Sequence, residues 1–143
     1  AALAREVVDA LAQSHPGAAV QLELADGLPT LNLDRTRMRL LLRNLLDNAL
    51  RHSAGAPQPP VLRVALQGQG VAFTVRDHGP GVPADALPHL AEPFYRPDTA
   101  RERATGGVGL GLYLCKLVAQ AHGGTFTVRN ALPGLEIAVT LPG

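Results

Sequence analysis

Residues 34–52, DRTRMRLLLRNLLDNALRH, restrict the fold of this chain more than any other stretch. Apolar side chains recur there at intervals of three and four residues, which is typical of one buried face of an α-helix. They are Met38, Leu41, Leu42, Leu45, Leu46 and Ala49. Asp34 stands directly before this pattern and is a plausible N-cap. The rest of the chain must supply an apolar layer that covers this face.

The remaining periodicity predicts that the second layer is a sheet. Alternating apolar and polar residues indicate strands at 20–24, 61–66, 71–76, 125–130 and 135–141, the last two joined by a turn at Leu132-Pro133-Gly134. Further helices are expected at 3–13 and at 109–122, the latter ended by Gly123. Strands and helices do not alternate regularly. We therefore expect an α/β (α+β) two-layer sandwich, in which helices cover one face of a mixed or antiparallel sheet.

Composition limits the classes of protein to which the chain can belong. A length of 143 residues suits one domain, 1–143, and its five aromatic residues mean that Leu, Val and Ala must fill the core. A formal net charge of +1 gives no reason to expect nucleic acid or membrane contact. The single cysteine, Cys115, excludes an internal disulfide and a cysteine-based zinc site, and it favours a reducing, cytoplasmic compartment.

Residues 1–18 begin within a helical pattern and without a methionine. We therefore expect them to be the end of a linker and a first helix, in a piece of a longer parent protein. The sequence contains neither a signal peptide nor an apolar run of the about 18 residues that a membrane span needs. A membrane anchor of the parent would lie outside this sequence.

Polar side chains form a stripe along the helix at 34–52. Asn44, Asn48, Arg51 and His52 fall within roughly a quarter of its circumference. Asparagine is a mediocre helix former, so two of them one turn apart need a reason. One reason is a half-exposed face with hydrogen bonds between helices. Another is a site in which amide oxygens bind Mg²⁺ and Arg51 neutralises phosphate.

A second polar motif, Asp77-His78-Gly79-Pro80-Gly81, follows directly on the strand at 71–76. Such residues make strand-ending turns in any protein, which is one interpretation. In the other, the Asp77 carboxylate accepts a hydrogen bond from the exocyclic amine of adenine. Guanine has an oxygen there, so Asp77 would select ATP over GTP. Gly79 and Gly81 would let the base approach the backbone.

Residues 77–106 show no periodicity and contain five prolines, and the part at 83–106 is typical of a functional lid. Because it has few apolar anchors, we expect the lid to be ordered only with bound ligand. Phe94 and Tyr95 within it either pin the loop onto the core or dock when ligand binds, and both interpretations stay open.

Residues 106–112, GGVGLGL, place four glycines directly before the last apolar helix. A tight turn needs one or two glycines, so four favour close approach of the backbone to a phosphate. The N–H groups at a helix start are unpaired, and the helix dipole favours an anion there. The stretch is neither a P-loop, since Gly-Lys-Ser/Thr is missing, nor a dinucleotide fingerprint, since no strand leads directly into it.

In this order, the four motifs resemble the N, G1, F and G2 boxes of the catalytic ATP-binding domain of two-component sensor histidine kinases. The resemblance covers roughly residues 20–143 and includes Ala121-His122-Gly123-Gly124. That domain belongs to an ATPase superfamily shared with DNA gyrase, mismatch-repair ATPases and heat-shock chaperone ATPases. The resemblance implies the Bergerat (GHKL) fold, with ATP and Mg²⁺ as cofactors.

The resemblance also implies a role for each matching residue. Asn48 would bind Mg²⁺, Asn44 would be the first asparagine of the N box, and Arg51 would lie near the phosphates. His52 would lie near the sugar, and Asp77 would read adenine with Gly79 and Gly81 beside it. The G2 box would contribute the phosphate-facing Gly107, Gly109 and Gly111, with Leu110 and Leu112 packed behind them, and the lid would contribute Phe94.

Two features depart from the family pattern. A phenylalanine usually stands three residues before position 94, where this chain has Ala91, so the lid anchor would be rearranged, for instance onto Leu90. The family's phosphoacceptor is a histidine followed by Glu or Asp, and no histidine of this chain has that context. The five histidines are His15, His52, His78, His89 and His122. The chain should bind ATP without containing its own acceptor.

The resemblance thus implies a kinase domain that donates the γ-phosphoryl group of MgATP to a histidine on a separate dimerisation domain of the parent, and indirectly to a response regulator. Hydrolysing members of the superfamily resemble one another in a glutamate at the position of Asn44, which cannot act as a base. Asp47 is expected to face solvent or a partner, because it lies away from Asn44 and Asn48 on the helix. Two alternatives stay open: an anti-sigma-factor-type serine kinase, and a non-catalytic nucleotide-binding scaffold of the same fold.

Overall fold

A computed structural model of the chain describes residues 2–14, 20–28, 33–52, 58–81, 83, 85, 87–90, 92, 111–131 and 133–142. Its elements follow one another as α1 (Ala2–Ser14), β1 (Gln21–Leu24), α2 (Arg35–His52), β2 (Val61–Gln67), β3 (Gly70–Arg76), the 3-10 turn η1 (Leu87–His89), α4 (Gly111–Ala121), β4 (Thr125–Asn130) and β5 (Leu135–Leu141). The final hairpin has the predicted bounds, and the other predicted elements differ from the observed ones by one or two residues at their ends.

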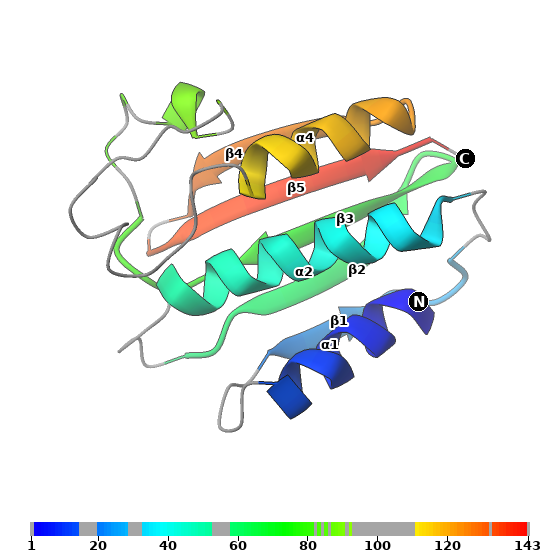
Figure 1. Cartoon of the computed structure of the whole chain (residues 1–143), viewed down its shortest axis with the longest axis horizontal. Helices are drawn as coiled ribbons and strands as arrows, with labels where there is room; N and C mark the ends of the chain where they lie inside the picture. The colour runs from blue at the N-terminus through cyan, green and yellow to red at the C-terminus, as the bar shows by residue number, and fades with distance from the viewer. Residues whose placement is uncertain are drawn as a thin grey trace.

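The five strands form one sheet in the order β1-β2-β3-β5-β4. β1 pairs with β2 in parallel, and the other three pairs are antiparallel. The helices α1, α2 and α4 lie next to one another across one face of this sheet (Figure 1). The expected two-layer sandwich with a mixed sheet is therefore confirmed. Its order leaves β3 and β5 in the interior of the sheet, each with a neighbour on both sides.

The core between the two layers is built as the periodicity predicts. All six apolar positions of α2 are buried, and none of them is more than 2% exposed. The sheet contributes alternate residues of its inner strands, among them Phe73, Val75, Ile137 and Val139. Phe73 is the one aromatic side chain that the described residues contribute to the buried core, so aliphatic side chains do fill it.

Local signals in the sequence fix where the helices begin and end. The carboxylate of Asp34 accepts a hydrogen bond from the Arg37 N–H at 3.1 Å, which confirms it as the N-cap of α2. At the same end of the layer, where α4 ends, Gly123 has a φ of 74°. Its N–H donates to Gln120, and the N–H of Gly124 donates to Ala119, so α4 closes with a Schellman motif.

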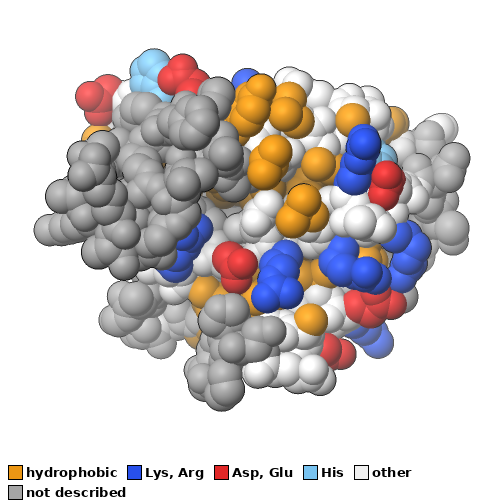
Figure 2. Space-filling model, viewed as in Figure 1, with side chains coloured by type: hydrophobic (Ala, Val, Ile, Leu, Met, Phe, Trp, Pro, Cys, Tyr) orange, Lys and Arg blue, Asp and Glu red, His pale blue; other side chains and the backbone are white. Residues whose placement is uncertain are grey.

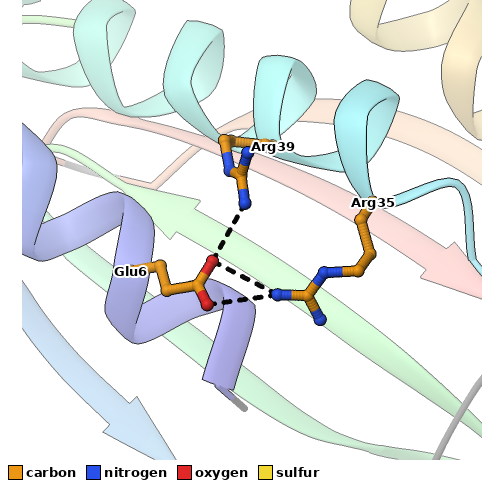
Figure 3. Close-up of polar contacts among 3 residues, drawn as sticks. All are labelled: Glu6, Arg35 and Arg39. Atoms are coloured by element: carbon orange, nitrogen blue, oxygen red, sulfur yellow. Dashed lines mark hydrogen bonds and ion pairs between the residues drawn. The ribbon is translucent and has the colours of Figure 1, made fainter.

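The helix layer presents two kinds of surface to solvent. Leu114 and Leu117 of α4 are 40% and 41% exposed, and apolar side chains gather over this helix (Figure 2). Charged side chains gather over α2. There Arg35 and Arg39 each donate a hydrogen bond of 3.1 Å to the Glu6 carboxylate of α1 (Figure 3). These ion pairs join α1 to α2. In the described part of the chain, no helix has both the length and the apolar character to cross a membrane.

Candidate functional site

Asp77 is the buried charged residue among those that the structure describes, and it directly follows β3. Its side chain is 2% exposed, and its Oδ1 accepts hydrogen bonds from the N–H groups of Gly79 at 3.0 Å and Leu135 at 3.1 Å. No described residue bonds its Oδ2. A buried carboxylate without hydrogen bonds would be very costly, and here two backbone donors hold it in one orientation.

Residues at the turn between β4 and β5 hold Asp77 in place through hydrogen bonds and a close backbone contact. The N–H of Asp77 donates to the Leu135 carbonyl at 3.0 Å, so both backbone and side chain of Asp77 bond the same residue. Gly134 has a φ of 93°, and a Cβ added there would lie 1.9 Å from the Asp77 carbonyl oxygen. Sequence reasoning treated this glycine only as part of a turn. Its contact with Asp77 depends on the β3–β5 pairing, which the local sequence does not reveal.

The G1 glycines lie beside Asp77 as expected. Gly79 supplies one of the two hydrogen bonds to the carboxylate. Gly81 has a φ of 74°, and a Cβ there would lie 2.6 Å from the Oδ1 atom of Asn130. His78 between them forms a hydrogen bond of 3.1 Å with the carbonyl of Pro59. The turn is therefore bonded to the segment before β2, and at Gly81 it packs closely against the end of β4.

On α2, the polar stripe of the sequence borders an open pocket of about 400 Å³. Its described lining consists of Asn44, Asp47, Leu50 and Arg51. Asn44 and Asn48 are half-buried and Arg51 is exposed. The structure thus brings Asn44 and Arg51 together at one pocket, whereas Asn48 is not among the residues that line it.

Asp47, which was expected to face solvent or a partner, lies at the open pocket. Asp47 is half-buried and lines the same pocket as Asn44, and its carboxylate lies 4.0 Å from the Arg43 guanidinium. Asp47 follows Asn44 by three residues, and residues at that spacing are neighbours on a helix surface. Because the pocket is open and broad, both side chains reach its wall.

Several predicted site residues lie outside the described part of the chain: Phe94, Gly107, Gly109 and Leu110. His52 ends α2, but its side chain is not described. Gly111 is the first residue of α4, and Leu112 is partly buried against the core. Leu90, the expected alternative anchor of the lid, is 7% exposed and belongs to the core cluster.

Two contacts tie α4 to α2, and sequence reasoning assigned a role to neither. The Nε2 atom of His122 accepts a hydrogen bond of 3.1 Å from the Asp34 N–H, while its Nδ1 bonds the Val118 carbonyl at 2.8 Å. This arrangement requires a neutral ring with its proton on Nδ1. In the middle of the helices, the Cys115 thiol donates to the Leu41 carbonyl at 3.5 Å, and burial raises the pKa of this thiol to about 12.

The donors on α2 fit a magnesium ion that is held partly by a nucleotide. The Asn44 amide and the Asp47 carboxylate line the pocket, and the Asn48 amide follows Asn44 by one helical turn. Mg²⁺ prefers oxygen ligands and usually takes only one or two from the protein, completing its shell with water and phosphate. The described residues contain no group of three or more His, Cys, Asp or Glu side chains that could hold a metal alone.

Comparisons with known proteins show the family to which the chain belongs. The model of the family described as "Histidine kinase-, DNA gyrase B-, and HSP90-like ATPase" matches residues 33–143. The alginate biosynthesis sensor protein KinB of Pseudomonas aeruginosa is 44% identical over 111 residues, which cover 78% of this chain and 18% of KinB. The probable sensor histidine kinase TcrY of Mycobacterium tuberculosis is 35% identical over 143 residues, covering 98% of this chain and 30% of TcrY.

A solved structure agrees in fold over almost the whole chain. Full-length ShkA in complex with AMPPNP superposes with a TM-score of 0.81 at 30% identity, covering 99% of this chain and 29% of that one. The chain therefore spans less than a third of the length of each of these three proteins.

Proposed function

The chain belongs to the family of histidine kinase-, DNA gyrase B- and HSP90-like ATPases, and we propose that it is the catalytic ATP-binding domain of a sensor histidine kinase. In this proposal it binds MgATP and donates the γ-phosphoryl group to a histidine on a separate, dimeric phosphoacceptor domain of its parent. One observation carries the proposal. A buried carboxylate, Asp77, is oriented by two backbone N–H groups on one oxygen and keeps its other oxygen free of described partners.

Asp77 would read the adenine base. Its Oδ2 would accept a hydrogen bond from the exocyclic amine, while Gly79 and Gly81 let the base approach the strand end. A guanine would present its O6 acceptor to the carboxylate, and two acceptors without a proton between them repel one another. Because the carboxylate is buried and already oriented, this mismatch would weaken GTP binding strongly.

The Asn face of α2 would form the phosphate end of the site. Asn48 would hold Mg²⁺ together with phosphate oxygens, with Asn44 and Asp47 near it and Arg51 at the mouth of the pocket. When bound, Mg²⁺ would offset phosphate charge. The N–H groups of Gly107, Gly109 and Gly111 would cradle the phosphates at the start of α4, where the helix dipole favours an anion. His52 would lie near the sugar, and Leu110 and Leu112 would pack behind the cradle.

Residues 83–106 would act as the ATP lid, with Phe94 as a docking residue and Leu90 as its anchor in the core. A cytoplasmic location and a response regulator downstream are part of the same proposal. Phosphoryl transfer depends mainly on positioning and electrostatic stabilisation, so a domain without a nucleophile can still be the catalytic one.

The described histidines support an acceptor outside this chain. Both ring nitrogens of His122 bond backbone groups, and His78 bonds the Pro59 carbonyl. The Nδ1 atom of His89 forms a hydrogen bond with the Glu92 carboxylate. Asn44 lacks the carboxylate with which hydrolysing superfamily members activate water. The chemistry therefore favours transfer to a partner over hydrolysis.

Titration calorimetry tests the first half of the proposal. The chain is titrated with ATP with and without Mg²⁺, and with GTP as the control. We expect ATP binding that Mg²⁺ strengthens and little GTP binding. Absence of ATP binding by folded protein would contradict the proposal.

The second half is tested with the parent protein and γ-labelled ATP. Acid-labile label on a histidine supports the kinase. Acid-stable label on a serine would favour a serine kinase, and tight binding without any transfer would favour a scaffold.

A further inference from the structure

Arg76 stands next to the base-reading carboxylate but on the opposite face of the sheet. Phe73, Val75 and Asp77 are buried at alternate positions of the strand, so these side chains share the helix-covered face. Arg76 lies between the last two and is half-buried, with its side chain on the other face. It therefore cannot contact a nucleotide that is bound at the Asp77 carboxylate.

The guanidinium of Arg76 instead holds the turn between β4 and β5. One of its nitrogens, Nη2, donates to the carbonyls of Ala131 and Pro133, each at 3.3 Å. Within the turn, the Ala131 N–H donates to the Gly134 carbonyl at 2.9 Å. In the described part of the chain, Arg76 is the one side chain that bonds the carbonyls of residues 131 and 133.

That turn determines where the Asp77 carboxylate points. Leu135, its next residue, donates to Oδ1 of Asp77 at 3.1 Å and accepts from the Asp77 N–H at 3.0 Å. Gly134 lies so close to the Asp77 carbonyl that no Cβ fits between them. A shift of the turn would therefore move the donor that orients the carboxylate.

The burial of Arg76 costs folding free energy, which an arginine exposed on the surface would not do. Its Nε atom is buried and has no hydrogen-bond partner among the residues that the structure describes. A buried N–H without a partner destabilises a fold by about 1–3 kcal/mol, so such groups call for an explanation. The charge-assisted bonds to the turn offset this cost and give the guanidinium a defined task.

We propose that Arg76 is a positioning residue for base recognition. By holding the turn at residues 131–134, it fixes the Leu135 N–H and thereby the orientation of Asp77, so that it sets the preference of the site for adenine over purines without an exocyclic amine. This inference rests on the proposed ATP-binding function.

The test compares ATP with inosine triphosphate, which carries an oxygen in place of the adenine amine. Dissociation constants for both are measured by calorimetry on the wild type, Arg76→Met and Arg76→Lys, well below each unfolding temperature. Arg129→Met is the matched control, because Arg129 lies on the adjacent strand pair, is exposed, and bonds Glu136 rather than the turn. Circular dichroism records the unfolding temperature of every variant.

We expect Arg76→Met to reduce the ratio of the two affinities by about tenfold, the worth of roughly one hydrogen bond to a charged group. Arg76→Lys should retain only part of the preference for ATP, because an ammonium group keeps the positive charge but lacks the planar fork of the guanidinium. Arg129→Met should leave the ratio unchanged. These results together would establish a role in base recognition, because a purely structural residue would lower the unfolding temperature without changing the ratio.

Two outcomes would overturn different statements. If the wild type itself binds ATP and inosine triphosphate equally, the proposed reading of adenine by Asp77 fails. If the wild type prefers ATP over inosine triphosphate and Arg76→Met keeps the same preference, Arg76 is only a structural residue. In that case this inference fails, while the proposed reading of adenine by Asp77 stands. Should Arg76→Met not fold, Arg76→Lys decides, and an unchanged ratio in that variant would contradict the proposal.

Discussion

The candidate site has two ends that are built in different ways: the proposed base end at Asp77 and the proposed phosphate end on α2. At the base end, Asp77 is 2% exposed and is oriented by backbone N–H groups from β5 and from its own turn. At the phosphate end, Asn44 and Asn48 are half-buried side chains on a helix, and Arg51 is exposed at an open pocket. The base end is therefore fixed by the fold itself, whereas the phosphate end consists of side chains that a metal and a nucleotide would bring together.

This difference follows the demands of the ligand. Selecting one base requires a donor–acceptor pattern that does not adapt, and backbone groups in a sheet adapt least. Holding phosphate and Mg²⁺ requires charge and oxygen ligands, and solvated side chains can supply both. Mutations at the base end should consequently change stability and selectivity, and mutations at the phosphate end should change mainly the metal-dependent part of binding.

The largest effect is expected for Gly134→Ala. The new Cβ would lie 1.9 Å from the Asp77 carbonyl oxygen at a φ of 93°, so the turn would have to move. We expect a loss of about 3 kcal/mol or more in the free energy of unfolding, measured in urea. Gly68→Ala is the matched control, because Gly68 has a φ of 60° but open space around it, and should cost about 1–2 kcal/mol. Equal losses would show that the turn does not restrain Asp77.

The next effect concerns selectivity. Asp77→Asn keeps an oxygen that can accept the N–H groups of Gly79 and Leu135, and it turns an NH₂ group toward the base. Since this group and the adenine amine are both donors, ATP affinity should fall by about 10- to 100-fold. Binding of inosine triphosphate should not fall, because its oxygen accepts from the new NH₂. A parallel loss for both nucleotides in calorimetry would mean that the substitution damaged the fold.

At the phosphate end, Asn48→Ala should remove most of the strengthening of ATP binding by Mg²⁺, about tenfold, and leave binding without Mg²⁺ nearly unchanged. Its stability should change by less than about 1 kcal/mol, because the side chain is only half-buried. Asn44→Ala tests the other amide in the same titrations. If Asn44→Ala alone abolishes the effect of Mg²⁺, the metal ligand is the asparagine that lines the pocket.

A pH effect on stability should appear at the contact of α4 with α2, where the Cys115 thiol bonds the Leu41 carbonyl. Burial raises the pKa of the Cys115 thiol from 9.0 to about 12, so the folded protein keeps a proton that the unfolded chain loses in this range. Stability should therefore fall as pH rises above 9, by up to about 1.4 kcal/mol per pH unit. The contribution of the thiol is the difference in the free energy of unfolding between the wild type and Cys115→Ala, measured in urea at each pH. A difference that is constant from pH 8 to 11 would contradict it.

The smallest effect on stability is expected on α1, far from both ends of the candidate site. Glu6→Gln removes the ion pairs with Arg35 and Arg39, whose side chains are more than half exposed. Exposed ion pairs contribute about 0–1 kcal/mol and weaken in salt. Thermal unfolding at low and high salt should show a small loss that disappears in high salt, with ATP binding unchanged. An effect on ATP affinity would mean that α1 influences the site.

Local signals made most of the fold predictable. The spacing of apolar residues in α2, the Asp34 cap and the turn glycines each act within a few residues, so the sequence displays them directly. Asp77 was predictable for the same reason, because its motif directly follows an alternating strand.

Contacts between distant residues were not predictable in this way. Gly134 lies 57 positions beyond Asp77 in the sequence, and His122 bonds Asp34 across 88. Both contacts arise only when β5 pairs with β3 and when α4 packs on α2. The pocket that Asp47 shares with Asn44 was not predictable either, because an angle on a helical wheel does not reveal how wide a pocket is.

The interior position of β3 and β5 in the sheet also determines when the base end can open. The edge strands β1 and β4 have one neighbour each and can separate by local fluctuations, whereas β3 and β5 lose their partners only when the sheet comes apart. The amide of Leu135, which bonds the Asp77 carboxylate, should therefore exchange its hydrogen with solvent more slowly than amides of the edge strand β1. Asp77, the proposed adenine reader, would then keep its orientation in forms of the domain whose edge strand β1 has frayed.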